Sequence, residues 1–214
     1  MTAYADESAA RALIVRTARS LFTRGLTHGS TGNLSVRLAD GSLLLTPTGS
    51  SLGTVEEGDM SRTDLHGRHL DGPRPTKEAF LHSAFYRARP GAHAVVHLHS
   101  TYAAALSCLD DVDPADALPP LTAYYAMRVG TLPLLPYRAP GDCDLEPLAE
   151  RAARGHHAVL LANHGPVVAG ASLEQAADAI EELEETAKLH LLLRGHTTRP
   201  LTPEQAAALS PTVG

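Results

Sequence analysis

The chain has 214 residues, of which 43% are apolar and 20% are charged, which is the balance of a globular protein with room for one sizeable core. Its formal net charge of -6, with no cluster of Lys and Arg, argues against a general nucleic-acid binder. No apolar run reaches membrane length, the polar N-terminus predicts no signal peptide, and the two cysteines form no Cys-x-x-Cys pair, so we expect a cytoplasmic protein.

The first half of the chain predicts two helices separated by short strands. Apolar residues recur at helical spacing before Gly25, which can close a helix, and again after Thr76, which can cap one. Alternating residues flank Asp40-Gly41, a pair typical of a tight hairpin turn. The expected elements are a helix at residues 6–24, strands at 33–38, 43–46 and 60–65, and a helix at 77–89.

The second half alternates apolar strands with helices. A β-branched run leads into His97, and Ser172 can cap a long helix that reaches about residue 194. We expect four glutamates on the solvent side of that helix: Glu181, Glu182, Glu184 and Glu185. The other expected elements are helices at 101–109, 121–127 and 144–154, strands at 132–136, 158–162 and 167–169, and a last turn or two at 202–209.

This order of elements predicts the fold class. Strands alternate with helices, and one pair of strands forms a clear hairpin. We therefore expect an α/β fold, a mixed β-sheet flanked by helices on both faces. The sequence contains no internal repeat and no linker, so residues 1–214 are expected to form one domain.

Three histidines form a candidate metal site. His97 and His99 follow a buried apolar run, and side chains two positions apart on a strand point to the same side. His164 follows another apolar run and precedes Gly165, so it also lies at a strand end. A lone His-x-His is more often a pair of ordinary histidines, but three imidazoles with an open position are the pattern of catalytic zinc. Nitrogen ligands also suit Cu, Ni, Co and Fe.

Glu78, in Pro75-Thr76-Lys77-Glu78, is the candidate acid or base. A carboxylate at a helix start is usually there because the helix dipole favours it. Near a metal ion it can instead be a fourth ligand or a general acid/base. Tyr124, beside Tyr125, is more simply a buried aromatic residue, although a phenol at the edge of a site can deliver a proton.

Three turns of small residues are candidates for binding phosphate. They are Gly32-Asn33, Thr48-Gly49 and Thr76-Lys77. Exposed backbone N–H groups, hydroxyl and amide donors and a helix start together form the kind of site that holds phosphate. Each turn alone is a weak signal, and Lys77 is by default a solvated charge.

Five motifs follow one another along the chain. They are Gly32-Asn33-Leu34-Ser35-Val36-Arg37, Thr46-Pro47-Thr48-Gly49, Pro75-Thr76-Lys77-Glu78, Val95-Val96-His97-Leu98-His99 and Asn163-His164-Gly165. In this order they resemble the class II aldolase/adducin family, and the resemblance covers nearly the whole chain. Within that family the resemblance is strongest to the 3-oxo-tetronate 4-phosphate decarboxylases, through residues 77–82, 99–101, 107–110 and 124–130.

The resemblance implies a set of roles for these residues. His97, His99 and His164 would be zinc ligands, and Glu78 would be the catalytic acid/base. Asn33, Thr48, Gly49, Thr76 and Lys77 would hold the substrate phosphate. Tyr124 would serve the site of a neighbouring subunit, since the family is typically tetrameric. Lys77 is a departure, because the family's fuculose-phosphate aldolases carry a small hydroxyl residue there.

The function implied is that of a zinc-dependent lyase. It would decarboxylate a 3-oxo-tetronate 4-phosphate to dihydroxyacetone phosphate and CO2 through a metal-stabilised enediolate. The first alternative is a sugar-phosphate aldolase, but family aldolases use a tyrosine near the C-terminus, and no aromatic residue follows Tyr137. A pentulose-phosphate 4-epimerase is less expected, because such enzymes tend to carry Asp in place of Glu78. An adducin-like binding module is also less expected, because Glu78 and all three histidines are retained.

Overall fold

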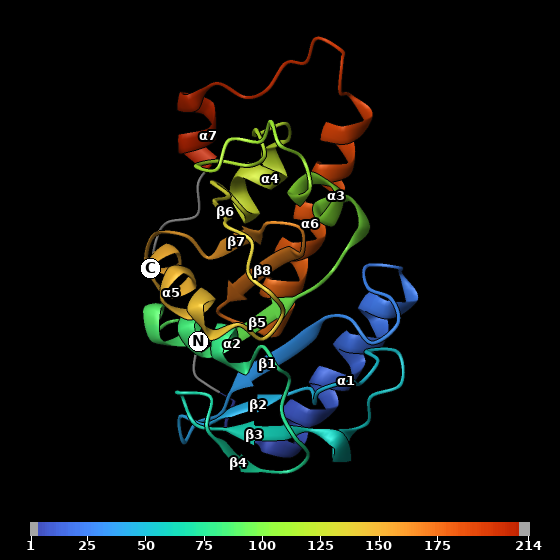
Figure 1. Ribbon diagram of the computed structural model, residues 1–214, viewed down its shortest axis with the longest axis vertical. Helices are drawn as coiled ribbons and strands as arrows, with labels where there is room; N and C mark the ends of the chain where they lie inside the picture. The colour runs from blue at the N-terminus through green and yellow to red at the C-terminus, as the bar shows by residue number, and fades with distance from the viewer. Residues whose placement is uncertain (1–3, 210–214) are drawn as a thin grey trace.

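The computed structural model describes residues 4–209, which form one mixed sheet of eight strands in the order β4-β3-β2-β1-β5-β8-β7-β6 (Figure 1). Neighbouring strands are antiparallel except for the parallel pair β6 and β7. The strands are β1 (Asn33–Arg37), β2 (Leu43–Leu45), β3 (Ser61–Thr63), β4 (His69–Asp71), β5 (Ala94–His97), β6 (Leu134–Leu135), β7 (Ala158–Leu161) and β8 (Gly165–Gly170). The helices are α1 (Glu7–Thr23), α2 (Ala79–Ala88), α3 (Thr101–Ser107), α4 (Ala123–Arg128), α5 (Glu146–Gly155), α6 (Leu173–Leu192) and α7 (Pro203–Leu209).

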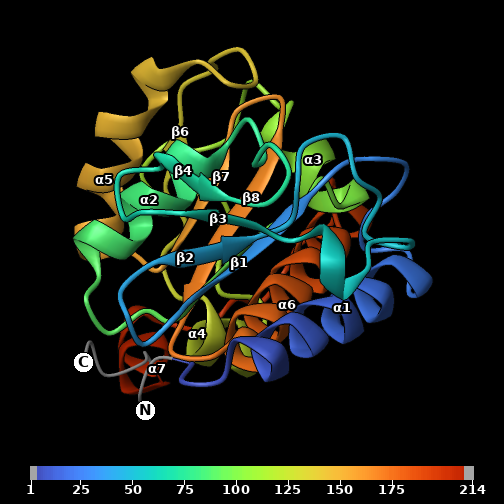
Figure 2. The ribbon, with the colours of Figure 1, turned by 90° about the horizontal axis from the view of Figure 1, so that it is seen from below.

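Helices cover both faces of the sheet, which confirms the predicted fold class (Figure 2). One core lies between the sheet and α1, α3, α4 and α6, and a second lies between the sheet and α2 and α5. Alternation along β1 sends Leu34 and Val36 into the first core. Ser35 therefore points to the other face, toward α2. This orientation places a polar side chain beside the helix whose N-cap residue is Glu78.

Most expected elements are found, but one strand was not predicted and the start of one helix was misplaced. β4 was not predicted, because all three of its residues are exposed and it shows no apolar alternation. Thr76 does not cap α2: the helix begins at Ala79, Glu78 occupies the N-cap position, and the Thr76 hydroxyl accepts a hydrogen bond from the Glu78 N–H at 3.3 Å. No helix in residues 4–209 is both long enough and apolar enough to cross a membrane.

Glu184 was expected on the solvent side of α6, and this was wrong. Its side chain is buried and accepts hydrogen bonds from the N–H groups of Tyr102 at 2.9 Å and Ala103 at 2.7 Å. These N–H groups belong to the first turn of α3, where no intrahelical acceptor exists. The carboxylate thus compensates the positive end of α3. The position of Glu184 along its own helix could not predict this contact, because its partner belongs to a different helix.

Candidate metal centre and its surroundings

The ends of β5 and β8 position the three histidines. His97 is the last residue of β5, and His164 directly precedes β8. Gly165 allows the backbone of this segment to lie close to that of Leu98. A Cβ at this position would lie 2.3 Å from the Leu98 carbonyl oxygen, which is too close for any other residue. The backbone of Asn163 and His164 is fixed against α3 by hydrogen bonds to Ser107. His99 lies beyond the strand, so the strand alternation used to pair it with His97 does not extend that far.

The structure brings Glu78, His97, His99 and His164 together as a group that could hold a metal ion. The Nε2 atoms are 3.1 Å apart between His97 and His99, 3.0 Å between His99 and His164, and 3.3 Å between His97 and His164. The Glu78 carboxylate lies 3.4 Å from the Nε2 of His97 and 3.2 Å from that of His164. Four ligand atoms from three separate segments therefore converge on one point.

These spacings fit a divalent ion with four ligands. At Zn–N distances of about 2.0–2.1 Å, the ligand atoms of a tetrahedral site are about 3.3 Å apart. The Nδ1 of His97 lies 2.8 Å from the Pro166 carbonyl oxygen, which can only accept a hydrogen bond. The proton is therefore on Nδ1, and the lone pair of Nε2 faces the cluster, as in histidines that bind metals. Lone pairs at this distance repel one another unless a cation lies between them.

Burial keeps His97 and His99 neutral. Desolvation lowers the pKa of His97, and it lowers the pKa of His99 to about 3, with a further contribution from its histidine neighbours. Burial would raise the pKa of Glu78, but His97, His164 and a hydrogen bond from Asn33 outweigh it and lower that pKa well below its usual range. A carboxylate beside neutral imidazoles is the protonation state that metal binding requires.

The metal-free protein should lose stability as the pH falls from about 6.5 toward 3. Unfolded histidines take up protons below about 6.5, whereas His82 and His99, each with a pKa of about 3, stay neutral when folded. Glu78 acts in the same direction, because the stability from its lowered pKa is lost on acidification. Each histidine contributes at most about 1.4 kcal/mol per pH unit. We expect the unfolding free energy, measured by urea titration with chelator present, to show this slope.

The matched control for that measurement is a second histidine. His99→Gln should flatten the slope, and the same change at the exposed His66 should leave it unaltered. A free energy of unfolding that is independent of pH between 6.5 and 4 would contradict the assignment of neutral histidines.

Asn33 connects Glu78 to a buried chain of hydrogen bonds. Its Nδ2 donates to the Glu78 Oε2 at 2.8 Å, and its Oδ1 lies 2.5 Å from the Nε2 of His82. The Nδ1 of His82 is 2.7 Å from the Ser35 hydroxyl, which is 2.9 Å from the Tyr86 hydroxyl. His82, Ser35 and Tyr86 were not predicted as site residues. The available signal was the spacing of four residues between Glu78 and His82, which share one side of a helix, and of two between Asn33 and Ser35 on a strand.

The predicted phosphate-binding residues lie on two neighbouring loops, apart from Asn33. Pro47 pairs with Pro75 in an isolated antiparallel bridge, and the Thr48 N–H donates to the Arg74 carbonyl at 3.1 Å. Gly49 has a φ of +74°, a conformation that favours glycine. Thr76 is buried and Lys77 is exposed. Asn33 differs from the others, because its amide is already bonded to Glu78.

Tyr124 lies outside the histidine cluster. It is 60% exposed on α4, and the Arg128 guanidinium lies 5.5 Å from the centre of its ring. Tyr125, its neighbour, is the buried one. The simpler prediction, a buried aromatic residue, therefore holds for Tyr125 and not for Tyr124.

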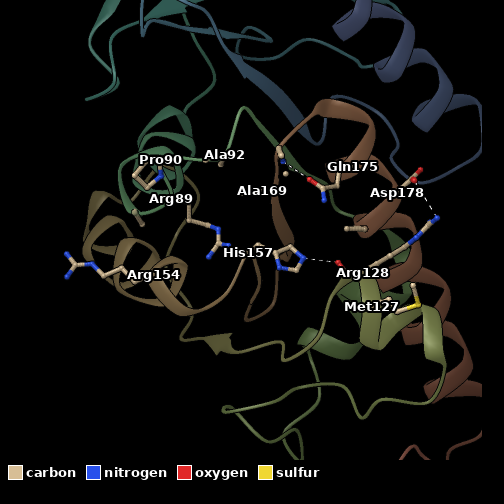
Figure 3. Close-up of a pocket in the computed structure, with 15 residues that line it drawn as sticks. Arg89, Pro90, Ala92, Met127, Arg128, Arg154, His157, Ala169, Gln175 and Asp178 are labelled. Carbon is tan, nitrogen blue, oxygen red and sulfur yellow. Dashed lines mark hydrogen bonds and ion pairs between the residues drawn. The ribbon is translucent and has the colours of Figure 1, made fainter. Parts of the chain in front are cut away.

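Figure 3 shows a cavity of about 610 Å³, and none of the four cluster residues lines it. It is lined by Ala92, just before β5, and Gly170, the end of β8, so it lies at the opposite end of these strands from His97 and His164. Two of its arginines are paired with carboxylates: Arg128 with Asp178 at 3.5 Å and Arg154 with Glu150 at 3.7 Å. None of the predicted site residues lines this cavity.

Comparison with known proteins decides the family. The Class II Aldolase and Adducin N-terminal domain matches residues 12–191. The chain belongs to this family. It is 50% identical, over 96% of its length and 94% of the relative's, to the 3-oxo-tetronate 4-phosphate decarboxylase of Pectobacterium atrosepticum. The Cupriavidus necator protein of that name is 43% identical over 94% of this chain and 93% of its own.

Solved structures of family members share the fold. The crystal structure of YgbL from Escherichia coli has a TM-score of 0.92 at 46% identity and covers 95% of this chain and 98% of its own. An L-fuculose 1-phosphate aldolase has a TM-score of 0.85 at 29% identity, covering 94% and 93%. The resemblance inferred from the motifs is therefore confirmed at the level of family and fold.

Proposed function

We propose that this chain is a metal-dependent carboxy-lyase that converts a 3-oxo-tetronate 4-phosphate to dihydroxyacetone phosphate and CO2. The observation that carries the proposal is the convergence of three imidazole Nε2 atoms and the Glu78 carboxylate at the end of β5. The names of near full-length relatives at 43–50% identity supply the substrate class. The test is release of CO2 from this substrate by the metal-loaded protein.

The roles of the residues follow from the chemistry. His97, His99 and His164 would hold a divalent ion, and the three nitrogen ligands favour zinc. When bound, the ion supplies Lewis-acid stabilisation of the negative charge that loss of CO2 leaves on the substrate oxygens. Glu78 takes up and delivers the proton that the product carbon requires. Its position also allows it to act as a fourth ligand when no substrate is present.

The remaining assignments extend this proposal. We place the protein in the cytoplasm as a homotetramer in which Tyr124 reaches a neighbouring subunit's site as a second proton donor. The exposure of Tyr124 and Met127 on α4 supports a subunit contact there. Asn33, Thr48, Gly49, Thr76 and Lys77 would surround the substrate phosphate.

The second candidate is an aldolase that cleaves a ketose phosphate. The L-fuculose phosphate aldolase of Escherichia coli is 35% identical over 83% of this chain and 80% of its own. Both reactions leave the same enediolate and need the same metal site. The absence of any aromatic residue after Tyr137 in the sequence favours the decarboxylase.

Lys77→Ala should raise KM for the phosphorylated substrate roughly tenfold and leave kcat nearly unchanged. The lysine would bind the phosphate equally in the ground state and the transition state, and loss of such uniform binding appears in KM. The control is Lys188→Ala, since Lys188 is the only other lysine of the chain and pairs with Glu185 on α6. If Lys77→Ala lowers kcat alone, the residue belongs to the proton chemistry.

A further inference from the structure

The donor and the acceptor of each hydrogen bond in the series that runs from Glu78 to Tyr86 can be assigned by starting at Glu78. The ionised carboxylate of Glu78 can only accept, so the Asn33 atom at 2.8 Å must be the amide nitrogen. The Asn33 oxygen then faces His82 and needs a donor, which places a proton on the His82 Nε2.

The same logic continues into the core. A neutral imidazole with a proton on Nε2 has a bare Nδ1, so the Ser35 hydroxyl donates to it. The Ser35 oxygen then accepts from the Tyr86 hydroxyl. All four donors point toward Glu78, so each bond polarises the next in the same sense. His82 and Ser35 are fully buried, so bulk water cannot replace these hydrogen-bond partners.

The other tautomer of His82 would reverse the contact at Glu78. With the proton on Nδ1, the bare Nε2 would require the Asn33 amide nitrogen as its donor. The Asn33 oxygen would then face the Glu78 carboxylate, and two acceptors 2.8 Å apart repel. The tautomer of His82 thus decides whether Asn33 holds Glu78 or repels it.

We propose that His82, with its proton on Nε2, is a positioning residue that donates to the Asn33 oxygen, fixes the orientation of the Asn33 amide and thereby holds Glu78 in place for proton transfer. This inference rests on the proposed role of Glu78. It assigns His82 no contact with the substrate. Substitution of residues that orient a metal ligand or its partner typically costs 10- to 100-fold in activity.

Two substitutions at this one buried position separate positioning from simple packing. His82→Gln places an amide nitrogen near the former Nε2 and keeps the donor to Asn33, whereas His82→Asn reaches only toward Ser35 and loses it. We expect His82→Asn to lower kcat about 10- to 100-fold, with KM and metal content little changed. His82→Gln should stay within a few-fold of the unsubstituted protein. Equal kcat values for the two variants would show a structural role only and overturn the proposal.

A measurement on the unsubstituted protein keeps the proposal testable if a variant does not fold. Nitrogen-15 NMR of the zinc-loaded protein should show His82 with a protonated Nε2 and a bare Nδ1. Asn33→Ala, which removes the acceptor of the Nε2 proton, should make this signature a mixture of tautomers. Ser83→Ala, which removes a buried hydroxyl with no hydrogen-bond partner among the described residues, should not. A proton on Nδ1 in the unsubstituted protein would overturn the assignment.

These readouts distinguish failure of this inference from failure of the proposed reaction. The NMR signature and the metal content require no turnover. If the protein releases an aldehyde from a ketose phosphate and no CO2, the proposed reaction fails, and the ratio of kcat between His82→Asn and His82→Gln is measured with that substrate.

Discussion

Replacing His97 with alanine should remove the bound metal ion and abolish turnover. His97 is fully buried, and its Nδ1 is fixed by the Pro166 carbonyl. Its Nε2 lies 3.1 Å from the Nε2 of His99, 3.3 Å from that of His164 and 3.4 Å from the Glu78 carboxylate. Among residues 4–209, no other His, Cys, Asp or Glu belongs to the group that could hold this ion. Elemental analysis of the purified protein should give about one divalent ion per chain before the substitution and only traces after it.

Thermal unfolding provides a second readout of the same change. A ligand that binds only the folded state stabilises it by mass action, so added zinc should raise the Tm of the unsubstituted protein. It should not raise the Tm of His97→Ala. The control is His157→Ala, which removes a histidine at the other end of the strands, bonded to the Arg128 carbonyl at 2.7 Å. If His97→Ala retains full metal content, the ligand assignment is wrong.

His97 and His164 show how much of the site could be predicted from the sequence. Periodicity placed His97 at a strand end and predicted the sheet with helices on both faces, because each of these depends on local alternation. The meeting of His164 with His97 depends on the antiparallel pairing of β5 with β8, which no local pattern encodes. In the sequence, the link between the two rested on the position of each at a strand end and on the family motifs.

The polar partners were the least predictable part. Glu184 and His82 are both buried, although glutamate is mostly exposed in proteins and histidine is intermediate. Each is compensated by groups from a distant segment: N–H groups of α3 for Glu184, and Asn33 and Ser35 of β1 for His82. The helix start at Ala79 was misplaced by two residues for a related reason, since Glu78 turns toward the histidines and not back to cap its own helix.

Glu78→Gln should keep the metal ion and slow turnover by roughly 10²–10⁴-fold, the range expected when a general acid/base is lost. The three imidazoles remain, and glutamine has the shape of glutamate, so Asn33 can still donate to its side-chain oxygen. The amide can no longer carry a proton to carbon. The matched control is Glu184→Gln, which alters another buried carboxylate and should lower stability at α3 while retaining kcat.

The reaction itself is decided by the co-product formed with two substrates. Both 3-oxo-tetronate 4-phosphate and fuculose phosphate can yield dihydroxyacetone phosphate or a related three-carbon product, so that product alone does not discriminate. An aldolase must exchange a proton with an aldehyde oxygen, and the sequence after Tyr137 offers no tyrosine for that task. A decarboxylase needs only a proton for carbon, which Glu78 would supply under the proposed function, with Tyr124 of a neighbouring subunit as a second donor if the proposed tetramer forms. We therefore expect CO2 from the first substrate, with Glu78→Gln slowing its release, and negligible aldehyde from the second. Efficient aldehyde release with negligible CO2 would establish the aldolase instead.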